Sequence, residues 1–139
     1  MLNQDLTLII DIDGTLCPSK RESDPISEYE NLEPYAPMVA KIREYKAQGY
    51  TIVLHTARHM RTAKGNVGVI LAKFSQHTFR WLEKHDIPYD EILFGKPWPG
   101  RRGFYVDDRA VRPSEFLKYS SEELERLIQH DSHVDSLRG

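Results

Sequence analysis

Two aspartates separated by one residue, Asp11 and Asp13, are the feature of this sequence that most clearly predicts chemistry. They follow the apolar run Leu6–Ile10, so they stand at the exit of a predicted buried strand. Two carboxylates held this close repel each other, and each loses hydration unless a cation or a proton compensates. The turn preferences of Asp and of the following Gly14 offer a purely local explanation. We favour a divalent metal and a division of labour between the two acids, because perturbed carboxylates cluster at functional sites.

Three further apolar runs share this arrangement, because each is followed closely by a polar residue. The runs and their polar successors are Thr51–His55 with Thr56, Ile92–Phe94 with Lys96, and Phe104–Val106 with Asp107 and Asp108. In a parallel sheet, ligands bind at the carboxyl ends of the strands. We therefore expect a hydroxyl, an ammonium group and several carboxylates to meet at one rim of a sheet.

Phosphoryl transfer through an aspartyl-phosphate needs this set of groups. One carboxylate attacks phosphorus in line, while a second acid protonates the leaving oxygen and then activates water as a base. A hydroxyl and an ammonium group stabilise the phosphoryl oxygens, and Mg²⁺ neutralises the approach of two anions. Mg²⁺ prefers a few carboxylate ligands together with water, rather than a complete protein cage.

The elements that would position these groups alternate between strand and helix. Apolar residues recur at helical spacing over 38–45 and over 70–81. Ser120 and Glu123 form a predicted capping box for a further helix. This alternation predicts an α/β fold, a Rossmann-like parallel sheet with helices on both faces.

Length and composition indicate one small cytoplasmic domain. The 139 residues carry a formal net charge of −2, which argues against binding of nucleic acid or membrane through bulk charge. The single cysteine, Cys17, suits a reducing compartment, and we find no signal peptide or membrane span. We expect one domain over 1–130, with 17–33 as a flap and 131–139 as a polar tail.

Four motifs in this order resemble those of the haloacid dehalogenase-like (HAD) phosphohydrolase superfamily. They are Asp11-x-Asp13-Gly14-Thr15, Thr56, Lys96-Pro97 and Asp107-Asp108. The resemblance implies that the strand before Asp11 is central, between those ending in Thr56 and Asp107. It also implies an open site without a separate cap domain, because the intervals between motifs hold only the flap, the helices and one strand.

The same resemblance implies a role for each motif residue. Asp11 would be the nucleophile, and Asp13 the general acid and base that gives a metal only its backbone carbonyl. Thr56 and Lys96 would bind the phosphoryl oxygens, and Asp108 would contact the metal through water or orient Lys96. The implied Mg²⁺ ligands are Asp11, Asp13, Asp107 and Asp108.

Residues around the second motif are candidates for binding the rest of an anionic substrate, since Arg recognises phosphate and carboxylate in a bidentate way. The candidate substrate-binding residues are Thr56, Ala57, Arg58, Arg61, Asn66 and Lys96. The stretches 56–58, 95–98 and 105–109 also resemble small phosphatases of capsular and surface polysaccharide biosynthesis. That likeness implies a phosphorylated sugar, polyol or glycan intermediate as the substrate.

Other functions stay open at this point. A phosphotransferase, a phosphomutase or a nucleotidase could use the same motifs, and a homo-oligomer could enclose the open site. A phosphoacceptor receiver domain also carries acids, a Thr and a Lys at strand ends, but there the Lys comes last. Here Lys96 precedes Asp107, so the order of the motifs argues against a receiver. A catalytically inactive phosphate-binding module is disfavoured because every motif residue is present.

Overall fold

The computed structural model describes residues 5–132, and the chain divides into two compact units, Met1–Trp98 and Pro99–Gly139. The prediction of a single domain over 1–130 stays a prediction. Of the predicted tail, 131–139, the first two residues belong to the last helix, and 133–139 lie outside the described residues.

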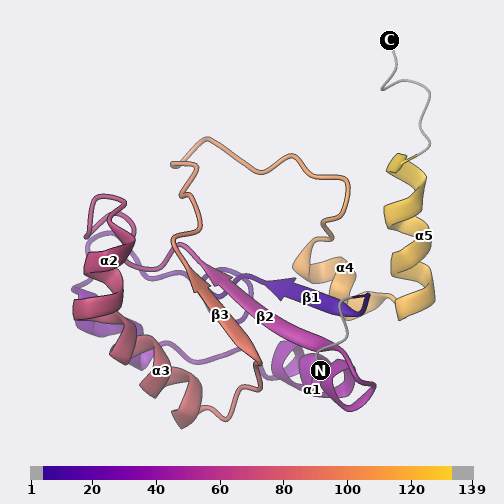
Figure 1. Cartoon of the computed structure of the whole chain (residues 1–139), viewed down its shortest axis with the longest axis horizontal. Coiled ribbons are helices and arrows are strands. Elements are labelled where there is room, and N and C mark those ends of the chain that lie inside the picture. The colour runs from indigo at the N-terminus through magenta and orange to yellow at the C-terminus, as the bar shows by residue number, and fades with distance from the viewer. Residues whose placement is uncertain (1–4, 133–139) are drawn as a thin grey trace. The chain divides into compact units, whose positions relative to one another are not determined.

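The first unit contains a parallel sheet of three strands in the order β1-β2-β3 (Figure 1). The strands are β1 (Thr7–Ile10), β2 (Thr51–Thr56) and β3 (Glu91–Phe94). Ile10 pairs with Leu54, and Thr56 pairs with Phe94, so the three carboxyl ends reach the same edge. The predicted parallel α/β arrangement is confirmed.

The central strand is β2, which explains its run of successive apolar residues. Ile52 and Leu54 are fully buried, and Val53 on the opposite side of the strand is also buried. In β1, Ile10 is buried, whereas its neighbour Ile9 is exposed.

The expected central position of β1 is wrong for this sheet, where β1 is an edge strand. The strand predicted on its other side, Phe104–Val106, is not formed, and the side chains of Phe104 and Val106 are exposed. A run of three residues becomes a strand only where a neighbouring strand completes its hydrogen bonds, so apolar character alone did not suffice.

The first crossover contains η1 (Ile26–Asn31), a 3₁₀ helix, and α1 (Ala36–Ala47). Pro37 lies in the first turn of α1, and Gly49, with φ 96°, follows its end, which are the positions that favour these residue types. The predicted flap, 17–33, includes η1, and its closure over a site stays a prediction. No cap domain is inserted in this crossover or in the next.

The second crossover is a helical run whose middle turn is wider than an α-helix. It consists of α2 (Val67–Val69), the π-helical segment η2 (Ile70–Phe74) and α3 (Ser75–Lys84). The Ser75 N–H donates to the Ile70 carbonyl five residues back, and the Ser75 hydroxyl donates to the Leu71 carbonyl at 2.6 Å. The predicted continuous helix over 70–81 is therefore interrupted, and π turns of this kind are frequent near functional sites.

The second unit contains two helices, α4 (Pro113–Lys118) and α5 (Ser121–Ser132). The capping box predicted for α5 is confirmed. The Glu123 N–H donates to the Ser120 hydroxyl at 3.2 Å, and the Ser120 N–H donates to the Glu123 carboxylate at 3.1 Å.

Candidate active site

The loop after β1 is a tight turn that directs two carboxylates away from the strand. The Gly14 N–H donates to the Cys17 carbonyl at 2.7 Å, and the Leu16 N–H donates to the Ile12 carbonyl at 2.8 Å. Gly14 has φ 83°, a backbone conformation that L side chains rarely adopt, so glycine fits this position. Ile12 is fully buried, which anchors the turn between the two acids.

Asp11 stands at the end of β1 beside a cation. Its Oδ1 lies 3.4 Å from the Lys96 Nζ, and its Oδ2 accepts a hydrogen bond from the Thr15 hydroxyl at 3.4 Å. Burial raises the pKa of Asp11 above its ordinary value, and the positive charge of Lys96 opposes that rise. The predicted nucleophile is thus close to the predicted phosphate-binding lysine.

Lys96 is positioned by the end of β2 and by an obligatory glycine. Its N–H donates to the Thr56 carbonyl at 3.0 Å. Gly95 has φ 91°, and a Cβ built on it would meet the Val67 Cγ2 at 2.6 Å, so only glycine fits between β3 and α2. Thr56 is fully buried, and its hydroxyl oxygen accepts the Arg58 N–H at 3.0 Å.

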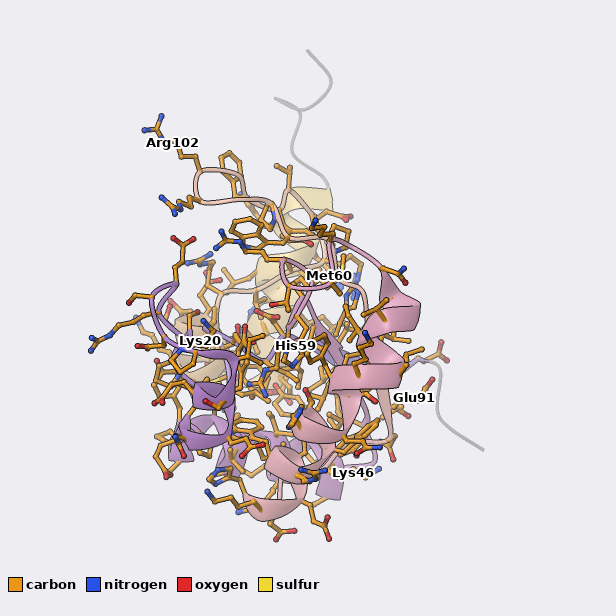
Figure 2. All side chains as sticks on the ribbon, turned by 90° about the vertical axis from the view of Figure 1, so that its left-hand side faces the viewer. Lys20, Lys46, His59, Met60, Glu91 and Arg102 are labelled. Carbon is orange, nitrogen blue, oxygen red and sulfur yellow. The ribbon has the colours of Figure 1, made fainter. Side chains whose placement is uncertain are left out.

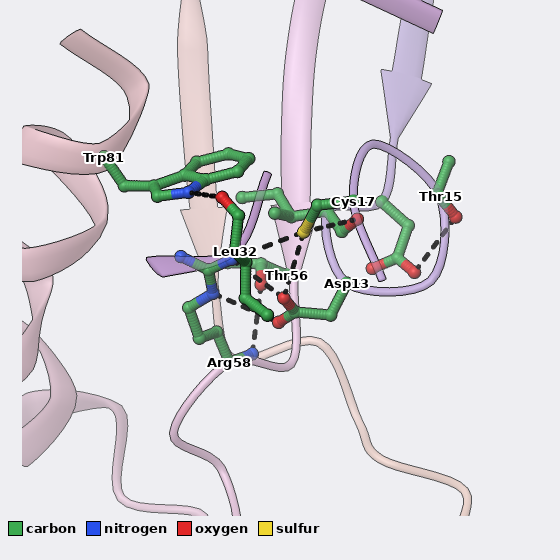
Figure 3. A network of polar contacts seen from close by, with 9 residues as sticks. Asp13, Thr15, Cys17, Leu32, Thr56, Arg58 and Trp81 are labelled. Atoms are coloured by element: carbon green, nitrogen blue, oxygen red, sulfur yellow. Dashed lines mark hydrogen bonds and ion pairs between the residues drawn. The ribbon is translucent and has the colours of Figure 1, made fainter. Parts of the chain in front are cut away.

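Asp13 is held by an arginine rather than left free at the rim (Figure 3). The Arg58 Nε donates to Asp13 Oδ2 at 3.1 Å, and the Arg58 Nη2 donates to Asp13 Oδ1 at 2.8 Å. Arg58 is only 2% exposed, so its guanidinium is not at the surface. Its Nε and Nη2 are occupied by Asp13, whereas its buried Nη1 has no hydrogen-bond partner, and the binding of substrate by Arg58 stays a prediction.

Two other predicted substrate-binding side chains are exposed near the same loop. Arg61 forms an ion pair with Glu22 from the flap, and its guanidinium carbon lies 4.6 Å from the centre of the Trp98 ring. Asn66 caps α2, because its side-chain oxygen accepts the Val69 N–H at 3.1 Å. The role of Ala57 stays a prediction, and its carbonyl accepts the Met60 N–H at 3.0 Å.

The acids of the fourth motif belong to the second unit, where both are exposed. The Asp107 carboxylate accepts the Arg109 N–H at 2.8 Å, which closes a short turn. Among residues 5–132, no group of three or more His, Cys, Asp or Glu side chains is gathered in a metal-binding arrangement. The predicted metal roles of Asp107 and Asp108 therefore stay predictions.

Sequence reasoning missed the residues that surround the Arg58 guanidinium. The rings of Tyr29 and Trp81 lie 4.6 Å and 5.0 Å from its central carbon, and the Cys17 Sγ lies 3.8 Å from its Nη2. Cys17 and Tyr29 fall in the predicted flap, and Trp81 was expected only as part of a helix core. No local pattern connects these residues with Arg58, because all three lie far from it along the chain.

A parallel sheet with Asp11 after β1, Thr56 at the end of β2 and Lys96 after β3 defines an HAD-like phosphohydrolase fold. Comparison with protein families identifies the branch, because residues 5–109 match the model of the polynucleotide kinase PNKP phosphatase domain. The chain belongs to this family of HAD-type phosphatases, which are phosphoric monoester hydrolases.

A solved structure agrees with this fold. The crystal structure of a target protein from Vibrio cholerae is 46% identical and covers 91% of this chain and 98% of that chain, with a TM-score of 0.83. A structure of the Pnkp1/Rnl/Hen1 RNA repair complex is 24% identical over 73% of this chain and 30% of that chain, with a TM-score of 0.49. No curated protein matches this chain. Within residues 5–132, no helix has the length and apolar character needed to cross a membrane.

Proposed function

We propose that this protein hydrolyses phosphomonoesters through an aspartyl-phosphate on Asp11. An Asp11 oxygen would form a bond to phosphorus as the ester P–O bond breaks, and water would later displace Asp11 from phosphorus. The observation that supports this proposal is the 3.4 Å approach of the Lys96 ammonium to the Asp11 carboxylate. That ammonium group reduces the repulsion between the carboxylate and an incoming phosphate.

Asp13 is proposed to carry the proton in both steps. It would protonate the leaving oxygen first and would then accept the proton of the attacking water. Each of its carboxylate oxygens accepts a hydrogen bond from Arg58, and this supports the backbone carbonyl of Asp13 as the group offered to a metal. The Thr56 hydroxyl oxygen accepts the Arg58 N–H, which leaves its proton for a phosphoryl oxygen.

The donor atoms at this rim fit Mg²⁺, because Asp11 and Asp13 offer only oxygen and Mg²⁺ prefers oxygen ligands. We propose the Asp11 carboxylate and the Asp13 carbonyl as ligands, with Asp107 and Asp108 assigned from their motif. When bound, Mg²⁺ would supply positive charge that stabilises the phosphoryl oxygens. Asp107→Asn should lower Mg²⁺ affinity, measured by calorimetric titration, far more than Asp13→Asn does.

The substrate proposed first is a phosphorylated sugar, polyol or glycan intermediate. The stretches around Thr56, Lys96 and Asp107 support it through their likeness to polysaccharide-biosynthesis phosphatases. The absence of an inserted cap in either crossover leaves room for a substrate larger than its phosphate.

A phosphorylated polynucleotide end is the second candidate. The matching family is named for polynucleotide kinase, and this is the observation that favours it. The formal net charge of −2 argues the other way, because bulk charge would not attract nucleic acid. The prediction that no nucleic acid is bound therefore needs a direct test.

One assay tests the reaction and ranks the substrates. Phosphate release would be measured with sugar phosphates, polyol phosphates, nucleotides and end-phosphorylated oligonucleotides, each with and without Mg²⁺. The variants are wild type, Asp11→Asn and the control Asp86→Asn, which changes an exposed carboxylate before β3 at the opposite edge of the sheet. Undiminished turnover by Asp11→Asn would exclude the mechanism, and transfer of phosphate to an alcohol in place of water would indicate a phosphotransferase.

A further inference from the structure

The Arg58 guanidinium is enclosed by three separate elements. The Tyr29 ring of η1 and the Trp81 ring of α3 lie within cation–π distance, at 4.6 Å and 5.0 Å. The Trp81 Nε1–H donates to the Leu32 carbonyl at 2.7 Å, so the end of the flap and α3 are joined directly beside the guanidinium (Figure 3). Asp13 completes the enclosure from the turn after β1.

The backbone after Arg58 is held in an unusual conformation. His59 has φ 70°, which is uncommon for a residue other than glycine, and it is 2% exposed. Its ring stacks on the Phe74 ring, with 4.7 Å between the ring centres, and makes an edge contact with the Tyr29 ring, with 5.0 Å between the centres. Figure 2 shows His59 among packed side chains. Phe74 is the last residue of the π-helical segment. His59, the residue after Arg58, is therefore held by contacts with two aromatic rings.

The charge and shape of Arg58 match a role that lysine could not fill. Burial lowers the pKa of the guanidinium, but the hydrogen bonds and charge of Asp13, together with smaller contributions from Cys17 and Tyr29, raise it by more, so the net direction is upward. The planar fork places two parallel donors on the two carboxylate oxygens, whereas a lysine ammonium offers one point charge. Because both carboxylate oxygens are engaged at once, this bidentate contact determines the orientation of the Asp13 side chain.

We infer that Arg58 is a positioning residue for Asp13, held in place by Tyr29 and Trp81, and that it does not bind the substrate. This inference rests on the proposed function, in which Asp13 carries the proton to and from the reacting oxygens. If Arg58 has this role, its loss should affect only the steps in which Asp13 transfers a proton. Loss of Arg58 should slow catalysis while leaving the affinity for substrate almost unchanged.

The leaving group provides a test that a general structural effect would not reproduce. An alkyl phosphate releases a basic alkoxide oxygen that needs a proton from Asp13, whereas an activated aryl phosphate releases a phenolate that needs little help. A misoriented Asp13 should therefore slow formation of the aspartyl-phosphate much more with the alkyl phosphate than with the aryl phosphate. Rapid-quench measurement of a single turnover isolates this first step from the later attack of water.

The experiment compares Arg58→Ala and Arg58→Lys with the matched controls Arg43→Ala and Arg43→Lys, which change an exposed arginine of α1 that also pairs with an aspartate. For Arg58→Ala we expect phosphoenzyme formation from the alkyl phosphate to fall about 10²- to 10³-fold, with about a tenfold loss on the aryl phosphate. KM should stay within about threefold of wild type. Added guanidinium ion should restore part of the lost alkyl activity, while the same concentration of ammonium should not.

Arg58→Lys keeps the positive charge and serves where Arg58→Ala does not fold, as judged by circular dichroism. Phosphoenzyme formation should again fall more for the alkyl phosphate than for the aryl phosphate, with both losses smaller than in Arg58→Ala. The loss remains because lysine cannot bind both carboxylate oxygens. Equal losses on both substrates, or a raised KM with unchanged kcat, would overturn the positioning role. Absence of any wild-type turnover would overturn the proposed function and this inference together, so the two failures are distinguishable.

Discussion

Arg58 and Arg61 lie three positions apart in one loop, yet the structure gives them opposite surroundings. Arg58 is buried, pairs with Asp13 through two hydrogen bonds and lies between two aromatic rings. Arg61 is more than half exposed, pairs with the exposed Glu22 and covers a Trp98 ring that is itself 44% exposed. Both form an ion pair and both contact an aromatic ring.

The difference between them shows that the contribution of an ion pair to stability depends on its surroundings more than on its presence. An exposed pair gains little, because water competes with it and salt screens it. A buried pair is costly to break from one side, because the remaining charge loses its partner where hydration is poor. We therefore treat the Arg58 side of the loop as part of the catalytic framework and the Arg61 side as surface.

The largest expected effect is the difference in the free energy of unfolding between a variant of Arg58 and the same variant of Arg61. Arg58→Met keeps an apolar chain between Tyr29 and Trp81 but leaves Asp13 unpaired, so the free energy of unfolding should fall by about 3 to 5 kcal/mol. Because Asp13 is one-fifth exposed, the lower end of that range is expected. Arg61→Met should change it by less than about 1 kcal/mol. Urea unfolding of both variants makes the comparison, and similar losses would contradict it.

Acid should destabilise the buried side of the loop through His59. Burial, then the charges of Arg58 and His77, lower the pKa of His59 from 6.5 to about 4. Above pH 6.5 neither state binds this proton, and stability is complete. As the pH falls toward 4, the unfolded chain binds the proton first, so up to about 3 kcal/mol is lost.

His59→Asn isolates this contribution, because Asn tolerates a positive φ and carries no titrating ring. The difference in unfolding free energy between wild type and variant should change over the interval from pH 6.5 down to about 4. Thermal or urea unfolding across this interval provides the measurement. A difference that is independent of pH would contradict the assignment.

A smaller loss is expected when the bond between the flap and α3 is removed. Trp81→Phe keeps a ring near Arg58 but leaves the Leu32 carbonyl without the Trp81 N–H, which should cost about 1 to 2 kcal/mol. Urea unfolding measures the loss. An unchanged midpoint would show that water replaces the indole donor and that this side of the loop is more open than we infer.

The smallest effect is expected at the exposed pair. Glu22→Gln removes the charge opposite Arg61 and should change stability by less than about 0.5 kcal/mol, with a difference that disappears in high salt. Unfolding at low and high salt concentrations is the measurement. A loss of several kcal/mol would mean that the flap depends on Glu22 and would remove the contrast between the two arginines.

Much of the first unit could be predicted from local sequence pattern. Apolar runs before Asp11, Thr56 and Lys96 located three parallel strands, and the polar residue after each located the rim. Pro37 lies in the first turn of α1, where proline is favoured, so it also indicates where this helix begins. These features depend on neighbours within a few residues, which is the range over which sequence patterns act.

The errors involve structures that the local apolar pattern does not distinguish. Phe104–Val106 has strand composition, but a strand exists only when a partner strand accepts its hydrogen bonds. The helix over 70–81 has an α-helical apolar pattern, yet the Ser75 N–H bonds to Ile70 instead of Leu71. In both cases the local pattern was compatible with more than one structure.

The sequence by itself determined which reactive groups follow the strands and in what order, and therefore the class of reaction. Only the tertiary structure decided that Arg58 faces Asp13, because 45 positions separate the two residues. They meet because β1 and β2 pair in parallel, with Ile10 opposite Leu54, so both chains leave the sheet at the same edge. Burial by Tyr29 and Trp81 then turns that proximity into a fixed contact, and no spacing along the chain encodes it.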